Sequence, residues 1–528
     1  MSFLRRRPDK SEKPNEPLSP AVSKQNSDDG NPPKTLEGRI AELREAFDRC
    51  DDFTVRQLVI GRDGTAAALV YISSLVDASI IENDLLRPLF AACDQAPLTQ
   101  DVLRKTVLPV SILRNAESAD DAVQSIAVGD VAFLTEGHAY GLIIINRSSR
   151  HRAIDAPTVE TTIRGPQDAF NEQLGATVAL IRQRLKTPDL AAEKLTVGSL
   201  TRTSVNLIYL KNLVMPGLAE ETRLRIARIA IDGILDAGQL QAFIEDSPLS
   251  PFGTTEYTER PDRVCAALLE GRLAIALDNT PNVLIVPSSM ASQLTSPEDY
   301  YNRFTFASAI RLIRYMALLI GLLAPATFVT LVSYHSELIP TLLLITIAQS
   351  RENIPFPAWM EALVMEATFE LLREAGVRLP RAFGQTISIV GAIVIGQAAI
   401  IAGLASPAMV VIVSLTAIAS YSIPSTTLAN SIRLLRFGFI FAAAVFGLPG
   451  MMTLLVLLLF HLASLRSFGV PFLAPGAPLI AGDLKDSFVR FPLWNKTNRP
   501  RLTGQRDPVR VHPDLMPSPG GPRPGRNH

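Results

Sequence analysis

The stretch AFGQTISIVGAIVIGQAAIIAGLASPAMVVIVSLTAIASYSIPSTTLANSI, residues 382–432, contains no Asp, Glu, Lys, Arg or His, and lies between Arg381 and Arg433. The hydrocarbon core of a bilayer requires about 20 mainly apolar residues per helix, so the stretch is long enough for two membrane-spanning helices. We expect these helices at 386–403 and 407–423. The sequence thus predicts a membrane protein, whose role is better sought in the passage of ions or solutes, or in signalling, than in catalysis.

Charged residues are unevenly distributed along the 528-residue chain. Lys and Arg together number 51, as do Asp and Glu, so the net charge favours no class of partner and we expect no nucleic acid. Polar residues dominate the first 300 positions, whereas the apolar runs fall between Ala309 and Leu465. A soluble part therefore precedes a membrane part. Because residues 1–10 lack the apolar region of a secretory signal, we expect the soluble part to stay in the cytoplasm.

The soluble part contains a mixed α/β pattern that occurs twice. Residues 69–76 (LVYISSLV) resemble residues 207–214 (LIYLKNLV), and residues 120–145 resemble residues 262–286, each being a helical run followed by two apolar strands. Both pairs are offset by about 140 residues. Two landmarks in the same order and at the same spacing indicate duplication of an α/β subdomain.

We therefore predict an α+β, multi-domain integral membrane protein, in which duplicated cytoplasmic α/β subdomains precede an α-helical transmembrane bundle of about five spans, with four to six as the range. The expected parts are a disordered polar tail (1–37), α/β subdomain 1 (38–150), a linker helix region (151–189), α/β subdomain 2 (190–305), a transmembrane helical domain (306–468) and a cytoplasmic, basic, Pro-rich C-terminal tail (469–528). The N-terminal tail is too poor in aliphatic residues to fold. The residues beyond Asn495 have two possible interpretations, which are a solvated tail and a basic segment attracted to anionic lipid headgroups.

The expected spans outside the charge-free stretch are less regular. Residues 315–334 form the first span. Residues 338–348 and 359–375 are interpreted as a broken helix pair that returns the chain across the membrane, and such a break at membrane depth is where a pathway is expected. The last apolar region, 437–465, is interrupted at Leu-Pro-Gly 448–450 and is one long span or two short ones. Basic residues after it favour two.

Ionisable side chains occur inside the expected membrane region. At 100° per residue, Glu366, Glu370 and Glu374 share one helix face with Arg373 beside them, whereas Glu361 points away. Such groups are costly at membrane depth and mark functional positions, although a helix lying at the membrane interface is the alternative. Two glutamines among apolar neighbours are either hydrogen-bonded between helices or line a pore. The candidate pathway or gating residues are Glu361, Glu366, Glu370, Arg373, Glu374, Gln385 and Gln397.

Motifs typical of enzymes are missing from the sequence. It contains no Gly-x-x-x-x-Gly-Lys-Ser/Thr, no Gly-x-Gly-x-x-Gly and no His-Glu-x-x-His. The six histidines are scattered, and Cys50, Cys93 and Cys265 lack paired spacing, so buried structural thiols are expected. We expect no catalytic residues, no cofactor and no metal site.

Seven longer motifs remain to be interpreted. They are YTERPDRV (257–264), LLEGR (268–272), SPEDYY (296–301), ELIPT (337–341), GQTISIVG (384–391), IGQAA (395–399) and LRSFGVP (465–471). Together they resemble the A-subunit family of spore germination receptors, the GerA type, over about residues 40–490. Arg-Gly-Pro 164–166 with Phe170 and Glu172 is also similar, but Gln167 stands where the family usually has a basic residue, and Gly-Ala 175–176 where it usually has Thr-Asn.

The resemblance implies a subunit of a nutrient germinant receptor in the inner membrane of the bacterial spore. It implies a transporter-like, nutrient-binding B subunit and a C-subunit lipoprotein as partners. It further implies that copies of the chain form an oligomeric channel that releases cations and so turns nutrient sensing into germination. The alternative from the residues is a stand-alone secondary transporter of a small solute, although no clear inverted repeat supports it.

Overall fold

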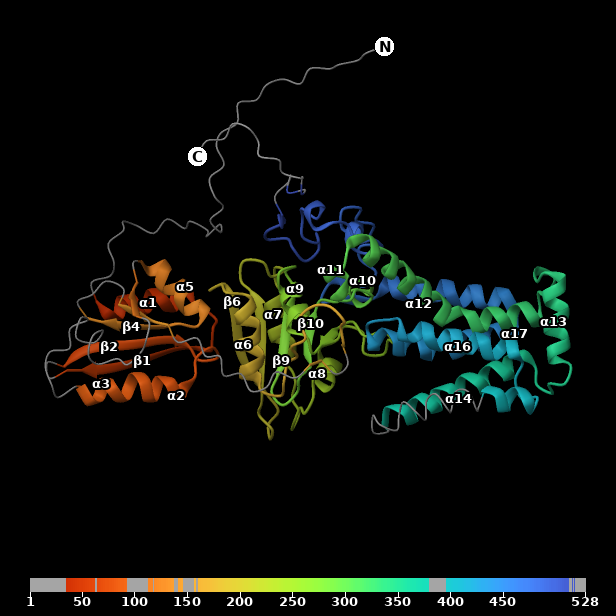
Figure 1. Ribbon diagram of the computed structural model, residues 1–528, viewed down its shortest axis with the longest axis horizontal. Coiled ribbons are helices and arrows are strands. Elements are labelled where there is room, and N and C mark those ends of the chain that lie inside the picture. Colours follow the sequence, from red (N-terminus) through yellow and green to blue (C-terminus); the bar gives the residue numbers. More distant parts are fainter. Residues whose placement is uncertain are drawn as a thin grey trace, which may run out of the picture.

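The computed structural model describes residues 35–61, 64–92, 113–116, 118–136, 141–145, 156–157, 160–378, 396–511, 515 and 517. Along its long axis a first sheet, a second sheet and a helical bundle follow one another (Figure 1). Most of the expected disordered tail, residues 1–34, lies outside the described residues. Helix α1 (Leu36–Ala46) begins directly afterwards, where the Thr35 side chain caps it by accepting a hydrogen bond from the Gly38 amide.

The first sheet has five strands in the order β1-β2-β4-β5-β3, with antiparallel pairing throughout. Alternate residues of its strand β2 point to opposite faces: Val70 packs with α1 and α5, and Leu69 packs with η1 and α3. Helices on both faces explain why this strand is apolar along most of its length. The elements after α1 are β1 (Phe53–Ile60), β2 (Thr65–Ile72), α2 (Ala78–Ile80), η1 (Ile81–Leu86), α3 (Arg87–Ala92), β3 (Leu113–Asn115), α5 (Ala119–Val128), β4 (Val131–Thr135) and β5 (Leu142–Ile144).

The second sheet has the equivalent order, β6-β7-β9-β10-β8, and again antiparallel pairing. Helices α7 and α8 cover one of its faces, and α6 and α9 cover the other. The repeated segments of the sequence occupy equivalent strands in the two sheets, which is the arrangement that a duplicated subdomain gives. The elements are α6 (Leu174–Arg184), β6 (Leu190–Val197), β7 (Thr203–Leu210), α7 (Leu218–Ala227), α8 (Ala237–Ile244), β8 (Glu256–Thr258), α9 (Pro261–Leu268), β9 (Leu273–Leu277), β10 (Val283–Val286), α10 (Met290–Gln293) and α11 (Glu298–Tyr301).

A buried ion pair joins the two sheet-containing parts. Arg182, 1% exposed, donates from Nε and Nη2 to the two carboxylate oxygens of Asp52, at 2.8 and 2.6 Å. Next to it, the free thiol of Cys50 is buried against the Leu190 carbonyl. Cys265 is also buried and free, whereas Cys93 lies outside the described residues.

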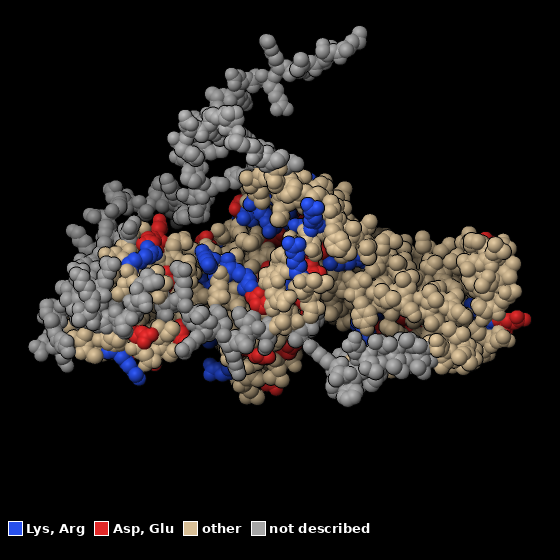
Figure 2. Space-filling model, viewed as in Figure 1, with Lys and Arg blue, Asp and Glu red and all other residues tan. Residues whose placement is uncertain are grey.

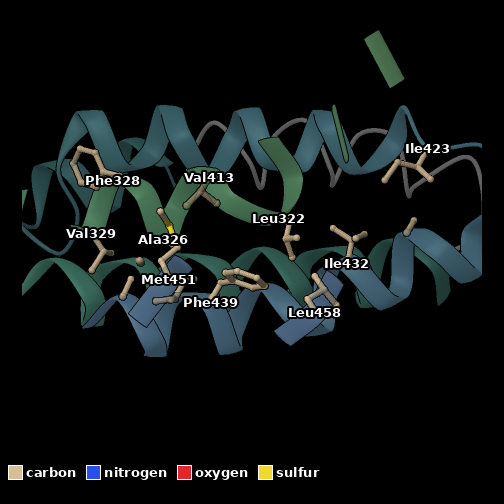
Figure 3. Close-up of a cluster of buried hydrophobic side chains, with 14 of the residues drawn as sticks. Leu322, Ala326, Phe328, Val329, Val413, Ile423, Ile432, Phe439, Met451 and Leu458 are labelled. Carbon is tan, nitrogen blue, oxygen red and sulfur yellow. The ribbon is translucent and has the colours of Figure 1, made fainter. Parts of the chain in front are cut away.

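The helical bundle packs through apolar residues of α12, α16 and α17 (Figure 3). By length and composition α12 and α17 are able to cross a membrane, and α16 is a shorter apolar helix. Charged residues gather over the sheets and are sparse on the visible bundle surface (Figure 2). The elements are α12 (Phe304–Ser333), η3 (Ser336–Leu338), α13 (Thr341–Arg351), α14 (Ala358–Arg378), α16 (Pro407–Tyr421) and α17 (Thr426–Ser464).

Element α17 consists of two helical segments that double back at Gly447, whose φ of 60° and ψ of −140° are not helical. His461, near the end of α17, lies 2.9 Å from the Ser250 hydroxyl. Near its start, Ser431 donates to the carbonyl of the adjacent Pro251. A straight helix would separate these two positions by about 45 Å, at 1.5 Å per residue. Two segments agree with the expectation for this region, although the first begins at Thr426 and not at 437.

The expected broken helix pair at membrane depth is wrong. Helix α13 lies across the far end of the bundle, and α14 is one continuous helix of 21 residues, about 31 Å long (Figure 1). The break between them therefore lies at the end of the bundle. Its physical cause is the pair Pro355 and Pro357, which cannot continue α13 and which place the start of α14 at Ala358.

The chain after α17 folds back between the second sheet and the start of α12 (Figure 1). We refer to residues 465–511 as the C-terminal segment. It contains β11 (Arg466–Ser467), β12 (Val470–Pro471), η4 (Asp483–Asp486) and η5 (Leu493–Asn495). The expectation of a solvated tail beyond Asn495 is wrong up to residue 511, because Lys496 and Arg510 pair with Glu270 and are held on the protein.

Candidate functional site

A buried arginine, Arg436 of α17, lies at the centre of the bundle and is 1% exposed. Its Nε donates to the Gly321 carbonyl at 2.6 Å, and its Nη2 donates to the Ser420 hydroxyl at 2.8 Å. Its Nη1 donates to Glu366 Oε2 at 2.6 Å. One side chain thereby links α12, α14 and α16 to α17.

The carboxylate of Glu366, also 1% exposed, has a partner on each oxygen. Arg436 contacts Oε2, and the Thr416 hydroxyl lies 3.1 Å from Oε1. A charge buried away from water is tolerated when it is paired and hydrogen-bonded, as these groups are. At this level the described polar groups form a bonded cluster without net charge.

A second ion pair lies closer to the sheets. Arg433 Nη1 contacts Glu370 Oε2 at 3.2 Å, with side-chain exposures of 18% and 29%. On the same side of α14, the guanidinium of Arg373 lies over the ring of Tyr421, 4.8 Å from its centroid. Two ion pairs and one cation–π contact therefore hold α14 to its neighbours α16 and α17.

The fully buried Glu361 lies in the first turn of α14. Its Oε1 accepts hydrogen bonds from the amide and the hydroxyl of Ser406, both at 2.5 Å. Because Ser406 is the N-cap of α16, the carboxylate lies at the positive end of that helix. Its other oxygen lies 3.7 Å from Arg351 Nη2.

The structure brings only part of the expected site together. Glu366 and Glu370 face arginines of α17, as one helix face predicts. Glu374 instead forms an exposed pair with Arg378, with side-chain exposures of 63% and 78%. Of the two glutamines, Gln397 is exposed and Gln385 lies outside the described residues.

The sequence reasoning missed the partners of the glutamates. In the sequence, Arg433 marks only the end of the charge-free stretch, and Arg436 belongs to none of the predicted site residues. A signal was present, because two arginines three residues apart in an apolar helix match two glutamates four residues apart in another. Charges that share a face on each of two adjacent helices are expected to pair.

No metal centre emerges from the part of the chain that the structure describes. Within it, no three His, Cys, Asp or Glu side chains group in a way that could hold a metal ion.

The chain is similar in sequence to known proteins over most of its length. Residues 41–502 match the family described as Bacillus/Clostridium GerA spore germination protein. Spore germination protein KA of Bacillus subtilis (strain 168) is 42% identical over 492 residues, 93% of this chain and 90% of that protein. The uncharacterized membrane protein YfkQ of the same organism is 42% identical over 483 residues, 90% of this chain and 94% of that protein.

One solved structure is also similar in sequence. It is the crystal structure of the N-terminal domain of the A subunit of the Bacillus megaterium spore germinant receptor GerK3. The identity is 29%, over 48% of this chain and 96% of that chain, with a TM-score of 0.37. A TM-score this low does not establish a shared arrangement.

Proposed function

Because this chain belongs to the GerA family of spore germination proteins, we propose that it is a membrane subunit of a nutrient germinant receptor. The family match over residues 41–502 is the observation that carries the proposal. In this role the chain transduces nutrient sensing into germination by forming an oligomeric cation-release channel in the inner spore membrane. Its partners are a transporter-like B subunit, a C-subunit lipoprotein, lipid and further copies of itself.

The helical bundle is the membrane part in this proposal. Its spans are α12, α14, the expected span at 386–403, α16 and the two segments of α17, and the two sheets lie in the cytoplasm. Residues 386–395 of the expected span lie outside the described residues, but a crossing there is required because α16 begins beside Glu361, at the opposite end of α14 from Arg378. Large apolar side chains on the outside of the bundle support a lipid environment, as for Val411, Phe441 and Phe460 at 66, 63 and 70% exposed. The lengths of α12 and α17 support it as well.

The cation path lies between copies of the chain, and not within one bundle. Within the described residues, Arg436 and Glu366 are paired with each other at the centre of the bundle, so their charges compensate and do not attract an ion there. Helix α14 has exposed apolar side chains, Val364 at 46% and Leu371 at 72%, which a second copy can cover. The pairs of Glu366 and Glu370 gate the path by holding α14 in place.

The test is nutrient-triggered cation release from spores in which this chain is the sole A subunit. Glu366→Gln weakens the charge pair with little change of shape, and we expect release to change in rate by at least about threefold at equal protein level. Glu374→Gln is the matched control. Because the ion pair of Glu374 with Arg378 is exposed and contributes little, cation release in these spores should match the wild type. Wild-type release in the Glu366→Gln spores would remove the ion pair from the mechanism.

A transporter is distinguished by a separate experiment. The purified chain in liposomes would take up a small solute without partner subunits if it were a secondary transporter. We expect no uptake, because the described polar groups at the bundle centre, Arg436, Glu366 and Ser420, bond to one another instead of facing a solute.

A further inference from the structure

The C-terminal segment is attached to the start of α12 by buried charges. Arg311 of α12 contacts Asp486 of the segment, Nη1 to Oδ1 at 3.0 Å. Its Nε also contacts Asp299 of α11 at 2.9 Å, and Arg314 Nη1 contacts the same Asp299 oxygen at 2.8 Å. Arg311 and Asp299 are 1% and 2% exposed. The segment, α11 and α12 therefore meet in one charged cluster shielded from water.

The same segment is attached to the second sheet-containing part. The Tyr300 hydroxyl donates to Asp486 Oδ2 at 2.8 Å, and Lys496 bonds to that carboxylate as well. Lys496 Nζ lies 3.5 Å and Arg510 Nη1 lies 3.0 Å from Glu270 Oε1. Asp486 is thus the point at which α12, α11 and the segment are joined.

A cavity of about 460 Å³ separates much of the segment from the sheet-containing part. It is lined by α9, by the loop after β10 and by residues 482–510. Because this contact is hollow, the segment gains less from apolar packing there than a closed interface would provide. Its attachment at this surface relies on the ionic contacts of Glu270 and on two hydrogen bonds to backbone carbonyls, from Arg499 to Leu269 and from Arg506 to Lys211.

Buried ion pairs resist sliding, because moving one partner leaves the other charge unpaired away from water. A rotation of the second sheet-containing part against α12 would separate Asp299 from Arg311 and Arg314. Asp486 of the segment contacts the same Arg311. The connection is therefore stiff as long as these charges remain paired.

We propose that residues 482–511 form a strap that transmits displacements of the second α/β subdomain to α12, with Asp486 as the joint. The inference rests on the proposed receptor function and assigns a route to its signal. Along the chain, the subdomain reaches α12 through α11 and a two-residue turn, Asn302 and Arg303, and the strap adds a second attachment to the contacts of Asp299 with Arg311 and Arg314.

The experiment compares Asp486→Asn with Asp507→Asn in the full chain. Asp486→Asn removes one charge from the joint at almost constant shape, whereas Asp507 is half exposed and, within the described residues, its carboxylate contacts Arg499 and the Val509 amide. Amide hydrogen exchange on the purified chain in detergent shows whether the strap is released. We expect at least about tenfold faster exchange over residues 483–511 in Asp486→Asn, with β9 and β10 unchanged, and wild-type exchange in Asp507→Asn.

Spores carrying each variant as the sole A subunit then report on signal transmission. The probe is a mixture of amino acids, glucose and a nucleoside, and the readout is the dilution that gives half-maximal germination. We expect Asp486→Asn to require at least about threefold more of the mixture at equal protein level, and Asp486→Glu, which keeps the charge, to restore most of the response.

Each other result overturns the inference. If hydrogen exchange shows that the strap is released in Asp486→Asn but the spores germinate as the wild type does, the segment only packs against the protein and does not transmit the signal. Unchanged hydrogen exchange in Asp486→Asn would mean that Asp486 does not hold the strap in place. Germination of Asp486→Asn spores at a lower nutrient concentration than the wild type would mean that the strap restrains α12. If Asp486→Asn does not accumulate, Arg510→Gln at the edge of the cavity is used, with the same outcomes. If spores with the wild-type chain fail to respond, the proposed receptor function fails, independently of the strap.

Discussion

Replacing Arg436 by Met tests the buried network most directly. The substitution keeps an apolar stem of similar length and removes the guanidinium that bonds to Gly321, Ser420 and Glu366. Glu366 is then left charged and buried with only the Thr416 hydroxyl as a partner. Removal of one partner of a buried ion pair costs about 3–5 kcal/mol. For a cooperative unit the size of the helical bundle, residues 304–464, the shift is about 2–4 °C per kcal/mol, so the midpoint of the bundle's unfolding should fall by about 6–20 °C.

The assay is thermal unfolding of the purified chain in detergent, followed by circular dichroism, in a double-mutant cycle. Glu366→Leu combined with Arg436→Met leaves no unpaired charge, so the double variant should be more stable than either single variant, with a coupling of at least about 2 kcal/mol. The exposed pair Glu374 and Arg378 provides the control cycle, with an expected coupling of about 0.5 kcal/mol or less. Additive effects at Glu366 and Arg436 would refute the reasoning.

Three further predictions concern other parts of the chain. Burial alone would raise the pKa of Glu256, but the charges of Arg263 and Arg272 outweigh it and lower that pKa to about 2. The ionised carboxylate therefore stabilises the fold fully above pH 4.5, and this contribution is lost as the pH falls towards 2. The measurement is the unfolding free energy of wild type and of Glu256→Gln, by denaturant titration at several pH values. The difference between the two proteins should shrink by about 3 kcal/mol between pH 4.5 and pH 2. Gly447→Ala should destabilise the bundle by about 1–3 kcal/mol in thermal unfolding, because φ of 60° with ψ of −140° excludes a side chain, whereas the helical Gly438→Ala should not. Arg182→Gln should speed proteolysis between the two sheet-containing parts several-fold, and an unchanged cleavage rate would show that the pair with Asp52 does not hold them together.

The sequence predicted the order of elements in the soluble part well. The two copies of the α/β pattern were visible because alternation and apolar runs are local properties, and the equivalent strands form two sheets of the same order. The exact ends of the subdomains and the number of membrane spans stay predictions. The family could be identified from motifs, because long strings of residues are more specific than periodicity.

Part of the site could also be predicted. The periodicity of α14 placed Glu366 and Glu370 on one face, and both carboxylates do meet partners there. Periodicity did not distinguish Glu374, because depth along the bundle decides whether a group on that face is covered. The role of Glu361 depended on Ser406, 45 positions later in the chain, so no local pattern contained it.

By itself, the sequence determined that an apolar helical part follows two related α/β units, since composition and periodicity are read within a few turns of the chain. Only the tertiary structure decided which charges meet. Arg436 finds Glu366 70 positions away, and Asp486 finds Arg311 175 positions away. These pairs depend on how helices pack and on where the chain reverses at Gly447. The physical reason is that an ion pair acts over a few ångströms, whereas local sequence leaves the relative position of distant helices open.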